Sequence, residues 1–217
     1  MLMEAERKEI VKISRFLFDK GFVQLSGGNV SMRDPNTQMV AIKPSGIAYN
    51  VMTPEDVIIC DLDGNVIEGE LKPSIETGMH TGVYKARQDV NAVIHCHAIY
   101  STAWSIKGKK YIPSVIVSQY VTNGAIKVAA YGHAGSKELA RNTIETLGQD
   151  YAVAMYGHGI LCCGPDMQWA LEATLVTEDA AKISFITECI PGDTHYLDRE
   201  ISDAEGFDAL ARIRHLM

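Results

Sequence analysis

The sequence lacks a long apolar run and a surplus of positive charge. No stretch of eighteen apolar residues occurs, and the N-terminal segment MLMEAERKEI is charged where a signal peptide needs an apolar core. The formal net charge is −7, which argues against a nucleic-acid groove or an anionic membrane surface as a partner. We therefore expect neither nucleic acid nor a membrane among the partners of this chain.

Cysteine is scarce and irregularly placed. The five cysteines, at positions 60, 96, 162, 163 and 189, are odd in number and scattered, which does not suit a disulfide framework. A reducing cytoplasm is the expected location. A length of 217 residues with 47% hydrophobic content suits one sizeable core, and no repeat or long linker separates a second one. We expect residues 1–217 to form one domain.

Hydrophobic periodicity and turn residues predict helices that alternate with short strands. The expected helices are an opening one that includes Leu17 and stops at Gly21, then 76–86, one through Trp104, 137–147, 166–187 and a short C-terminal one. The expected strands are 39–42, 57–60, NAVIHCHA, 114–117 and a pair within YAVAMYGHGILCCG. DLDGNVIEG has the turn residues of a hairpin. These elements indicate a mixed sheet flanked by helices.

Two histidines, His95 and His97, lie one residue apart in the apolar run VIHCHA. Because side chains alternate across a strand, both would project from one face and could reach one ion. Cys96 would point to the opposite face and pack as a small buried residue. The alternative is a pair of histidines on a half-exposed strand, hydrogen-bonded to water.

A third histidine, His158, stands between two glycines in AVAMYGHGILCCG. The glycines permit a tight turn, which a ligand bent over a metal would need. An ordinary turn histidine is the alternative for His158 taken alone. Three histidines together suit a catalytic zinc, which takes three protein ligands and keeps one position open. We interpret Cys162 and Cys163 as core residues of the following strand.

Three short polar stretches are candidates for anion binding: LSGGNVS at 25–31, KPSG at 43–46 and KPSIE at 72–76. Consecutive glycines before Asn29 can aim backbone N–H groups at an anion, and each proline fixes a turn beside a serine hydroxyl. KPSIE also leads into an expected helix, whose N-terminus favours anions. Three solvated loops are the alternative. Beside a candidate metal, the stretches predict a small phosphorylated substrate.

The stretches GGNVS, KPSG, KPSIE, NAVIHCHA and GHGILCCG resemble, in order and spacing, the class II aldolase family, which includes L-fuculose-1-phosphate aldolase and L-ribulose-5-phosphate 4-epimerase. The resemblance covers roughly residues 8–190. It implies a three-layer α/β/α sandwich around a mixed, mostly antiparallel sheet, and a homotetramer with active sites between subunits. It also implies one zinc ion per subunit and cleavage of a ketose 1-phosphate to dihydroxyacetone phosphate and an aldehyde.

Carried over motif by motif, the resemblance makes His95, His97 and His158 the zinc ligands. It gives Glu76 two roles: a zinc ligand in the resting enzyme, and the acid/base once substrate displaces it. The resemblance also assigns the substrate phosphate to side chains and backbone groups of Gly28, Asn29, Ser45, Gly46, Ser74 and Ile75.

Two departures from the family pattern bear on the reaction. Family aldolases commonly carry a second serine where this chain has Ile75, so only a backbone N–H can donate there. They also use tyrosines from a neighbouring subunit and the C-terminal tail. Tyr120 lies near the first of these positions, and the tail ARIRHLM has no tyrosine.

Glu76 helps to choose between branches of the family. The epimerases carry an aspartate at this position, so the glutamate favours an aldolase. A related epimerase, dehydratase or decarboxylase is an alternative within the enzymes. A non-enzymatic assembly domain is the alternative outside them, although such a domain has lost the metal ligands that this chain retains.

Cleaving a carbon–carbon bond beside a carbonyl requires a group that holds the negative charge left behind. Zinc does so as a Lewis acid, and a lysine Schiff base is the other general solution. Lys43 and Lys72 are available, but each precedes a proline in a turn that we expect to be solvated. Three histidines and a glutamate favour the metal route, with Glu76 moving the proton between substrate oxygen and carbon.

Overall fold

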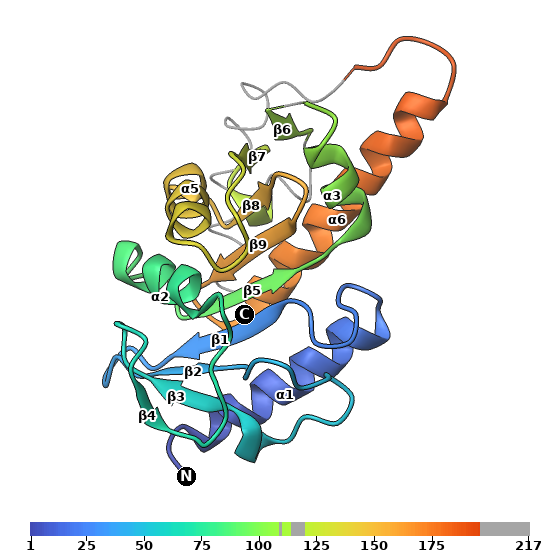
Figure 1. The fold of residues 1–217 in the computed structure, drawn as a ribbon. Coiled ribbons are helices and arrows are strands. Elements are labelled where there is room, and N and C mark those ends of the chain that lie inside the picture. Colours follow the sequence, from blue (N-terminus) through green and yellow to red (C-terminus); the bar gives the residue numbers. More distant parts are fainter. Residues whose placement is uncertain (109, 114–119, 196–217) are drawn as a thin grey trace.

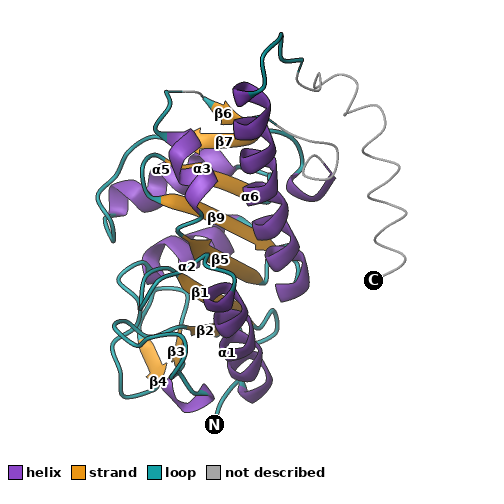
Figure 2. Ribbon diagram, turned by 90° about the vertical axis from the view of Figure 1, so that its right-hand side faces the viewer, coloured by secondary structure: helices purple, strands orange, loops and turns teal. Residues whose placement is uncertain are grey.

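A mixed sheet forms the middle layer of the protein, and helices cover both of its faces (Figures 1 and 2). The computed structural model describes residues 1–108, 110–113 and 120–195. Within these residues the sheet has nine strands in the order β4-β3-β2-β1-β5-β9-β8-β7-β6. Strands β7 and β8 run parallel, and the other neighbours run antiparallel. The predicted three-layer, mostly antiparallel architecture is confirmed.

The strands are short. Their bounds are β1 Asn29–Arg33, β2 Val40–Ile42, β3 Ile58–Cys60, β4 Val66–Glu68, β5 Ala92–Cys96, β6 Tyr111–Ile112, β7 Ile126–Ala129, β8 Ala152–Met155 and β9 Gly159–Gly164. The central strand β5 lies between β1 and β9, and its five residues are all buried. Burial on both faces explains why β5 is apolar without alternation up to its histidine.

Each face of the sheet packs against its own helices. One face is covered by α1 (Glu4–Asp19), α3 (Ile99–Ser105) and α6 (Met167–Cys189), and the other by α2 (Thr77–Ala86) and α5 (Lys137–Leu147). A 3₁₀ turn, η1, spans Pro54–Asp56. Two apolar clusters, one per face, form the core. None of the described helices has the length and hydrophobicity needed to cross a bilayer.

Most predicted elements occur at the expected places. Helix α5 matches the prediction at both ends, and α2 begins at Thr77 with Glu76 as its N-cap residue. The hairpins β3–β4 and β8–β9 are also confirmed. Strands β1, β6 and β7 were not predicted. The predicted strand at 114–117 and the short C-terminal helix lie outside the described residues.

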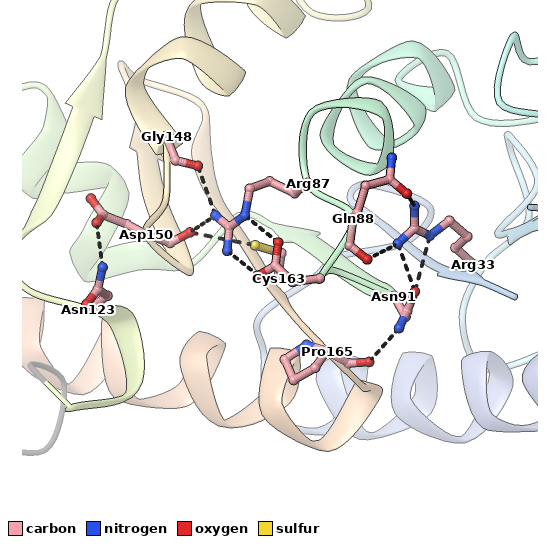
Figure 3. A network of polar contacts seen from close by, with 10 residues as sticks. Arg33, Arg87, Gln88, Asn91, Asn123, Gly148, Asp150, Cys163 and Pro165 are labelled. Atoms are coloured by element: carbon pink, nitrogen blue, oxygen red, sulfur yellow. Dashed lines mark hydrogen bonds and ion pairs between the residues drawn. The ribbon is translucent and has the colours of Figure 1, made fainter. Parts of the chain in front are cut away.

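Two buried arginines fix the start of β5, the end opposite its histidine (Figure 3). Arg33 donates to the Gln88 carbonyl at 2.8 Å and to Asn91 Oδ1 at 3.0 Å. Arg87 donates to the Gly148 carbonyl at 2.9 Å. These charge-assisted bonds tie the α2–β5 connection to the sheet and to the end of α5. The register of β5, which delivers the histidine to the site, is held in this way.

Candidate metal centre

Three histidine side chains converge beyond the end of β5. His95 lies in the strand, His97 follows it directly, and His158 lies in the turn between β8 and β9. One ring nitrogen from each histidine lies within 4.8 Å of the others. The ring centroids are 4.9 to 5.4 Å apart. The structure therefore brings together the three histidines that the sequence singled out.

Two glycines allow the neighbouring segments to press against β5. Gly159 has a φ of +136°, and a Cβ there would lie 2.2 Å from the Cys96 carbonyl oxygen. Gly28 has a φ of +76°, and its Cβ would lie 2.7 Å from the His95 carbonyl oxygen. A side chain at either position would be strained and would push the backbone away from the strand. Glycine is required at both positions, so that the turn carrying His158 and the start of β1 can pack closely against the end of β5.

The cysteine between the histidines points into the core, as predicted. Cys96 is fully buried in the apolar cluster on the face of the sheet that α1 and α6 cover. Val93 and His95, at the alternate positions of the strand, point to the other face. Burial raises the pKa of the Cys96 thiol well above its usual range. Cys162 and Cys163 are also fully buried, on β9. These thiols therefore serve packing.

Glu76 completes the cluster from the N-terminal end of α2. Its side chain is 6% exposed, with Oε2 3.3 Å from His95 Nε2 and Oε1 3.5 Å from His158 Nε2. The Asn29 amide donates to Oε2 at 2.9 Å. Burial raises the pKa of Glu76, but His95, the Asn29 donor and His158 together lower it below its usual value. The group is therefore a carboxylate at neutral pH.

The chemistry of these donors fits a divalent metal ion. Among the described residues, Glu76 Oε1, His95 Nε2 and His158 Nδ1 are buried without a hydrogen-bond partner, which is costly unless something else binds them. His95 Nδ1 donates to the Ile160 carbonyl at 2.8 Å, which leaves its Nε2 lone pair free. Burial lowers the pKa of His95 to about 4, so the ring is neutral. Neutral imidazoles and a carboxylate can hold zinc.

A cavity of about 300 Å³ opens beside the histidines. It is lined by the three polar stretches together with the metal-site side chains, including Gly28, Asn29, Ser45, Gly46, Ser74, Ile75, Glu76, His97 and His158. The two Lys-Pro-Ser turns lie side by side, because Pro44 and Pro73 form a bridge and Ser45 N donates to the Lys72 carbonyl at 2.8 Å. Stretches far apart in the sequence therefore meet at one hollow.

Ser74 is placed to donate into this cavity. Its Oγ accepts from Asn29 Nδ2 at 2.9 Å and from Glu76 N at 3.2 Å, so its own hydroxyl hydrogen stays available. Ile75 follows with a side chain that is 68% exposed. The position that would carry a second hydroxyl in family aldolases thus lies at the surface of the cavity.

Lys43 departs from its predicted setting. We expected a solvated turn, but the side chain is 1% exposed and lines the cavity. Its Nζ donates to the carbonyls of Pro44 at 3.1 Å and Ser26 at 3.3 Å, and it lies 4.7 Å from the centroid of the Tyr49 ring. Burial lowers the pKa of Lys43 to about 8. The prediction was wrong because the paired turns cover this side chain, whereas Lys72 is exposed as expected.

Among the described residues, no tyrosine lines the cavity, although the family resemblance led us to expect tyrosines on the aldehyde side. Tyr120 is half-buried and is not among the residues that line its own chain's cavity. The tail ARIRHLM lies outside the described residues. His80 was not predicted from the sequence; it lies one helical turn after Glu76 and is fully buried on the inner face of α2. Its spacing of four residues from Glu76 was the available signal.

Comparisons with known proteins agree with this geometry. Residues 8–185 match the Class II Aldolase and Adducin N-terminal domain family. The L-fuculose phosphate aldolase of Methanococcus maripaludis is 38% identical over 178 residues, which cover 82% of this chain and 95% of that protein. The 5-deoxy-D-ribulose 1-phosphate aldolase of Bacillus thuringiensis serovar kurstaki is 35% identical over 190 residues, 88% and 89% of the two chains.

A solved structure gives the same result. An L-fuculose 1-phosphate aldolase superposes with a TM-score of 0.91 at 30% sequence identity, and the match covers 96% of this chain and 98% of that one. Sequence and fold thus agree over nearly the whole chain. This protein belongs to the class II aldolase and adducin N-terminal domain family, and its named relatives above are aldolases.

Proposed function

We propose that this protein cleaves a ketose 1-phosphate, such as L-fuculose 1-phosphate, to dihydroxyacetone phosphate and an aldehyde, with one zinc ion per subunit. The observation that carries the proposal is the convergence of His95, His97, His158 and Glu76 beside a cavity lined by the three polar stretches. Candidate metal donors and candidate anion donors thus line one cavity of about 300 Å³. Such a pairing suits a phosphorylated sugar that reacts next to its carbonyl.

The three histidines would hold the ion, and Glu76 lies close enough to join them. A bound zinc ion would supply Lewis-acid stabilisation for the negative charge that develops on the substrate's carbonyl oxygen. The protein contributes the neutral His95 ring, whose tautomer is fixed by the bond from Nδ1 to the Ile160 carbonyl, on a strand held at its far end by Arg33 and Arg87. The fold holds Glu76 Oε1 and His95 Nε2 in buried positions, so binding of an ion there would require little reorganisation.

Glu76 would move the proton that the reaction requires. Its carboxylate is ionised at neutral pH and accepts from Asn29, which orients one oxygen and leaves Oε1 without a hydrogen-bond donor. A free, buried carboxylate oxygen that lines the cavity can take a proton from a substrate hydroxyl and return it to carbon. Glu76 is the N-cap residue of α2, so the helix places its backbone, and the Asn29 amide orients its carboxylate.

The phosphate would bind at the opposite side of the cavity. The hydroxyls of Ser45 and Ser74 and the backbone N–H groups of Gly28 and Gly46 are candidate donors. The Lys43 ammonium adds a positive charge that no described carboxylate neutralises by an ion pair. A buried cation without an anionic partner is costly, and a substrate phosphate would compensate that charge.

The names of the relatives suggest which substrates to test first. Purified zinc-loaded protein should release dihydroxyacetone phosphate from L-fuculose 1-phosphate or from 5-deoxy-D-ribulose 1-phosphate, measured by a coupled reductase assay. Unphosphorylated ketoses should react far more slowly. Equal turnover of both classes would contradict the phosphate assignment. An epimer or a dehydrated product without dihydroxyacetone phosphate would favour the other enzymes of this fold.

Replacing Ser74 with alanine should raise the KM for phosphorylated substrates by roughly tenfold. The variant loses one hydrogen bond from a neutral hydroxyl to the phosphate anion, which contributes about 1.5 kcal/mol. The kcat should change less than KM. Initial-rate kinetics with a ketose 1-phosphate measure both constants. Ile75→Ser is the matched gain variant, since a hydroxyl at the cavity surface should lower KM. If both variants behave like the parent, the KPSIE turn does not contact the phosphate.

A non-enzymatic assembly role is the remaining alternative of a different class. The intact donor set argues against it, because such a role gives no reason to bury unpartnered imidazole and carboxylate atoms. We further propose a homotetramer, with the aldehyde side of each site completed by a neighbouring chain. Support comes from the cavity, which no tyrosine of the described residues lines. Sedimentation equilibrium of the full chain would test this assembly.

A further inference from the structure

A series of hydrogen-bonded polar side chains lies buried between β1 and α2 and ends at Glu76. Strand β1 contributes Asn29, Ser31 and Arg33. Opposite them lie Glu76, the N-cap residue of α2, and His80 and Tyr84 on the buried face of that helix. All six side chains are buried, and none of them is more than 6% exposed. Two residues of a strand span about 6.8 Å, and four residues of a helix span about 6.0 Å. Every second residue of β1 can therefore face every fourth residue of α2.

Successive hydrogen bonds join these side chains. Tyr84 OH lies 2.7 Å from Ser31 Oγ, and Ser31 Oγ lies 2.6 Å from His80 Nδ1. His80 Nε2 bonds to Asn29 Oδ1. Asn29 Nδ2 donates to Glu76 Oε2 and to Ser74 Oγ, each at 2.9 Å. The series leads from the middle of the core to the carboxylate in the site.

Only one assignment of donor and acceptor is possible for each hydrogen bond of this series. The Glu76 carboxylate only accepts, so Asn29 presents its NH₂ to the site and its carbonyl oxygen to His80. His80 Nε2 must then donate. Burial lowers the pKa of His80 to about 3, so the ring is neutral and its Nδ1 accepts from Ser31. Ser31 has then used its hydrogen and accepts from Tyr84.

We infer that His80 is a positioning residue, whose Nε2–H holds the Asn29 amide in the one orientation that donates to Glu76. The inference deepens the proposed function and rests on it for the role of Glu76. With the amide turned over, the Asn29 oxygen would face the Glu76 carboxylate, and that contact would become repulsive because neither oxygen carries a hydrogen. His80 opposes this flip because only a carbonyl oxygen can accept its proton. The carboxylate thereby keeps its orientation beside the histidines.

The tautomer of His80 tests the inference without any substrate. In zinc-loaded protein labelled with ¹⁵N-histidine, long-range ¹H–¹⁵N spectra at neutral pH should show the His80 ring with a protonated Nε2 and an unprotonated Nδ1. The signal is identified by its loss in His80→Gln. A ring protonated on Nδ1 alone would reverse every bond of the series and overturn the inference. This readout stands even if the protein turns over none of the proposed sugars.

Two replacements of His80 separate positioning from mere packing. In His80→Gln the amide nitrogen can reach the place of Nε2 and donate to Asn29, whereas the shorter side chain of His80→Asn can reach only Ser31. Asparagine should lower kcat by roughly 10–100-fold at unchanged zinc content, as loss of an outer partner of a metal site does. Glutamine should restore most of that activity.

A remote buried hydroxyl provides the control for lost stability. Thr174 in α6 is fully buried and donates to the Ala170 carbonyl at 2.8 Å. Thr174→Val should therefore lower stability without altering turnover. Equal losses of activity in His80→Asn and His80→Gln, or turnover in His80→Asn that matches Thr174→Val, would reduce His80 to a packing role. Should His80→Asn fail to fold, the tautomer and the glutamine variant still decide the question.

Discussion

Glu76→Gln should lower the rate of aldol cleavage by roughly 10²–10⁴-fold, the usual contribution of a positioned general acid/base. The amide keeps the size and the acceptor oxygen that Asn29 contacts, so folding and the loops that line the cavity should be unaffected. Three imidazoles remain to hold the ion, and zinc content should stay close to the parent value. Rate measurements and metal analysis on the same preparation check both statements.

Glu76→Asp is the matched variant, because it retains the charge and shortens the side chain by one methylene. The carboxylate would retreat by about 1 Å, which is enough to cost up to 10²-fold when the reacting groups must stay aligned. Impaired cleavage in both variants would support a positioned base. Near-normal cleavage by zinc-replete Glu76→Gln would remove this residue from the mechanism.

His97→Ala should abolish most zinc binding and most activity together. His97 is exposed, so its replacement costs little folding energy, and the result reports on the metal rather than on the core. The loss should exceed the roughly 10–100-fold expected when only an outer partner of a ligand is removed. Zinc stoichiometry by atomic emission and turnover of a ketose 1-phosphate are the two measurements.

Cys96→Ala is the control from the same strand. Its thiol packs in the core on the far face of β5, so its loss should leave zinc and activity nearly unchanged and should lower the free energy of unfolding by roughly 1 kcal/mol. Zinc lost from Cys96→Ala but retained in His97→Ala would contradict the assigned ligands.

The sequence allowed the helices and the three histidines that converge in the structure to be predicted, because their signals are local. Helix α5 shows an apolar period, a serine N-cap and a terminal glycine, and its bounds were correct. The pair His95 and His97 follows from strand alternation alone. His158 is identified by its flanking glycines, and the structure supplies their reason, since Gly159 must approach β5 too closely for any Cβ.

Other features depend on contacts between distant segments, which no local pattern reveals. Strand β1 was missed because its residues Asn29, Ser31 and Arg33 are polar, and their hydrogen-bond partners Glu76, His80 and Tyr84 lie far along the chain, at the start of α2 and within it. These residues alternate with Val30 and Met32 as in a strand with one solvated face, but here α2 covers the polar face. Lys43 was misplaced because the pairing of two Lys-Pro-Ser turns, 29 residues apart, covers it.

The most direct test of the metal-dependent mechanism is dihydroxyacetone phosphate release from a ketose 1-phosphate before chelation, after chelation and after zinc is restored. We predict that the chelated protein stays folded, loses its activity and regains it with zinc, and that borohydride added with substrate does not inactivate it. Full activity after removal of the metal, together with inactivation by borohydride through Lys43, would contradict the metal mechanism and assign the chemistry to a Schiff base.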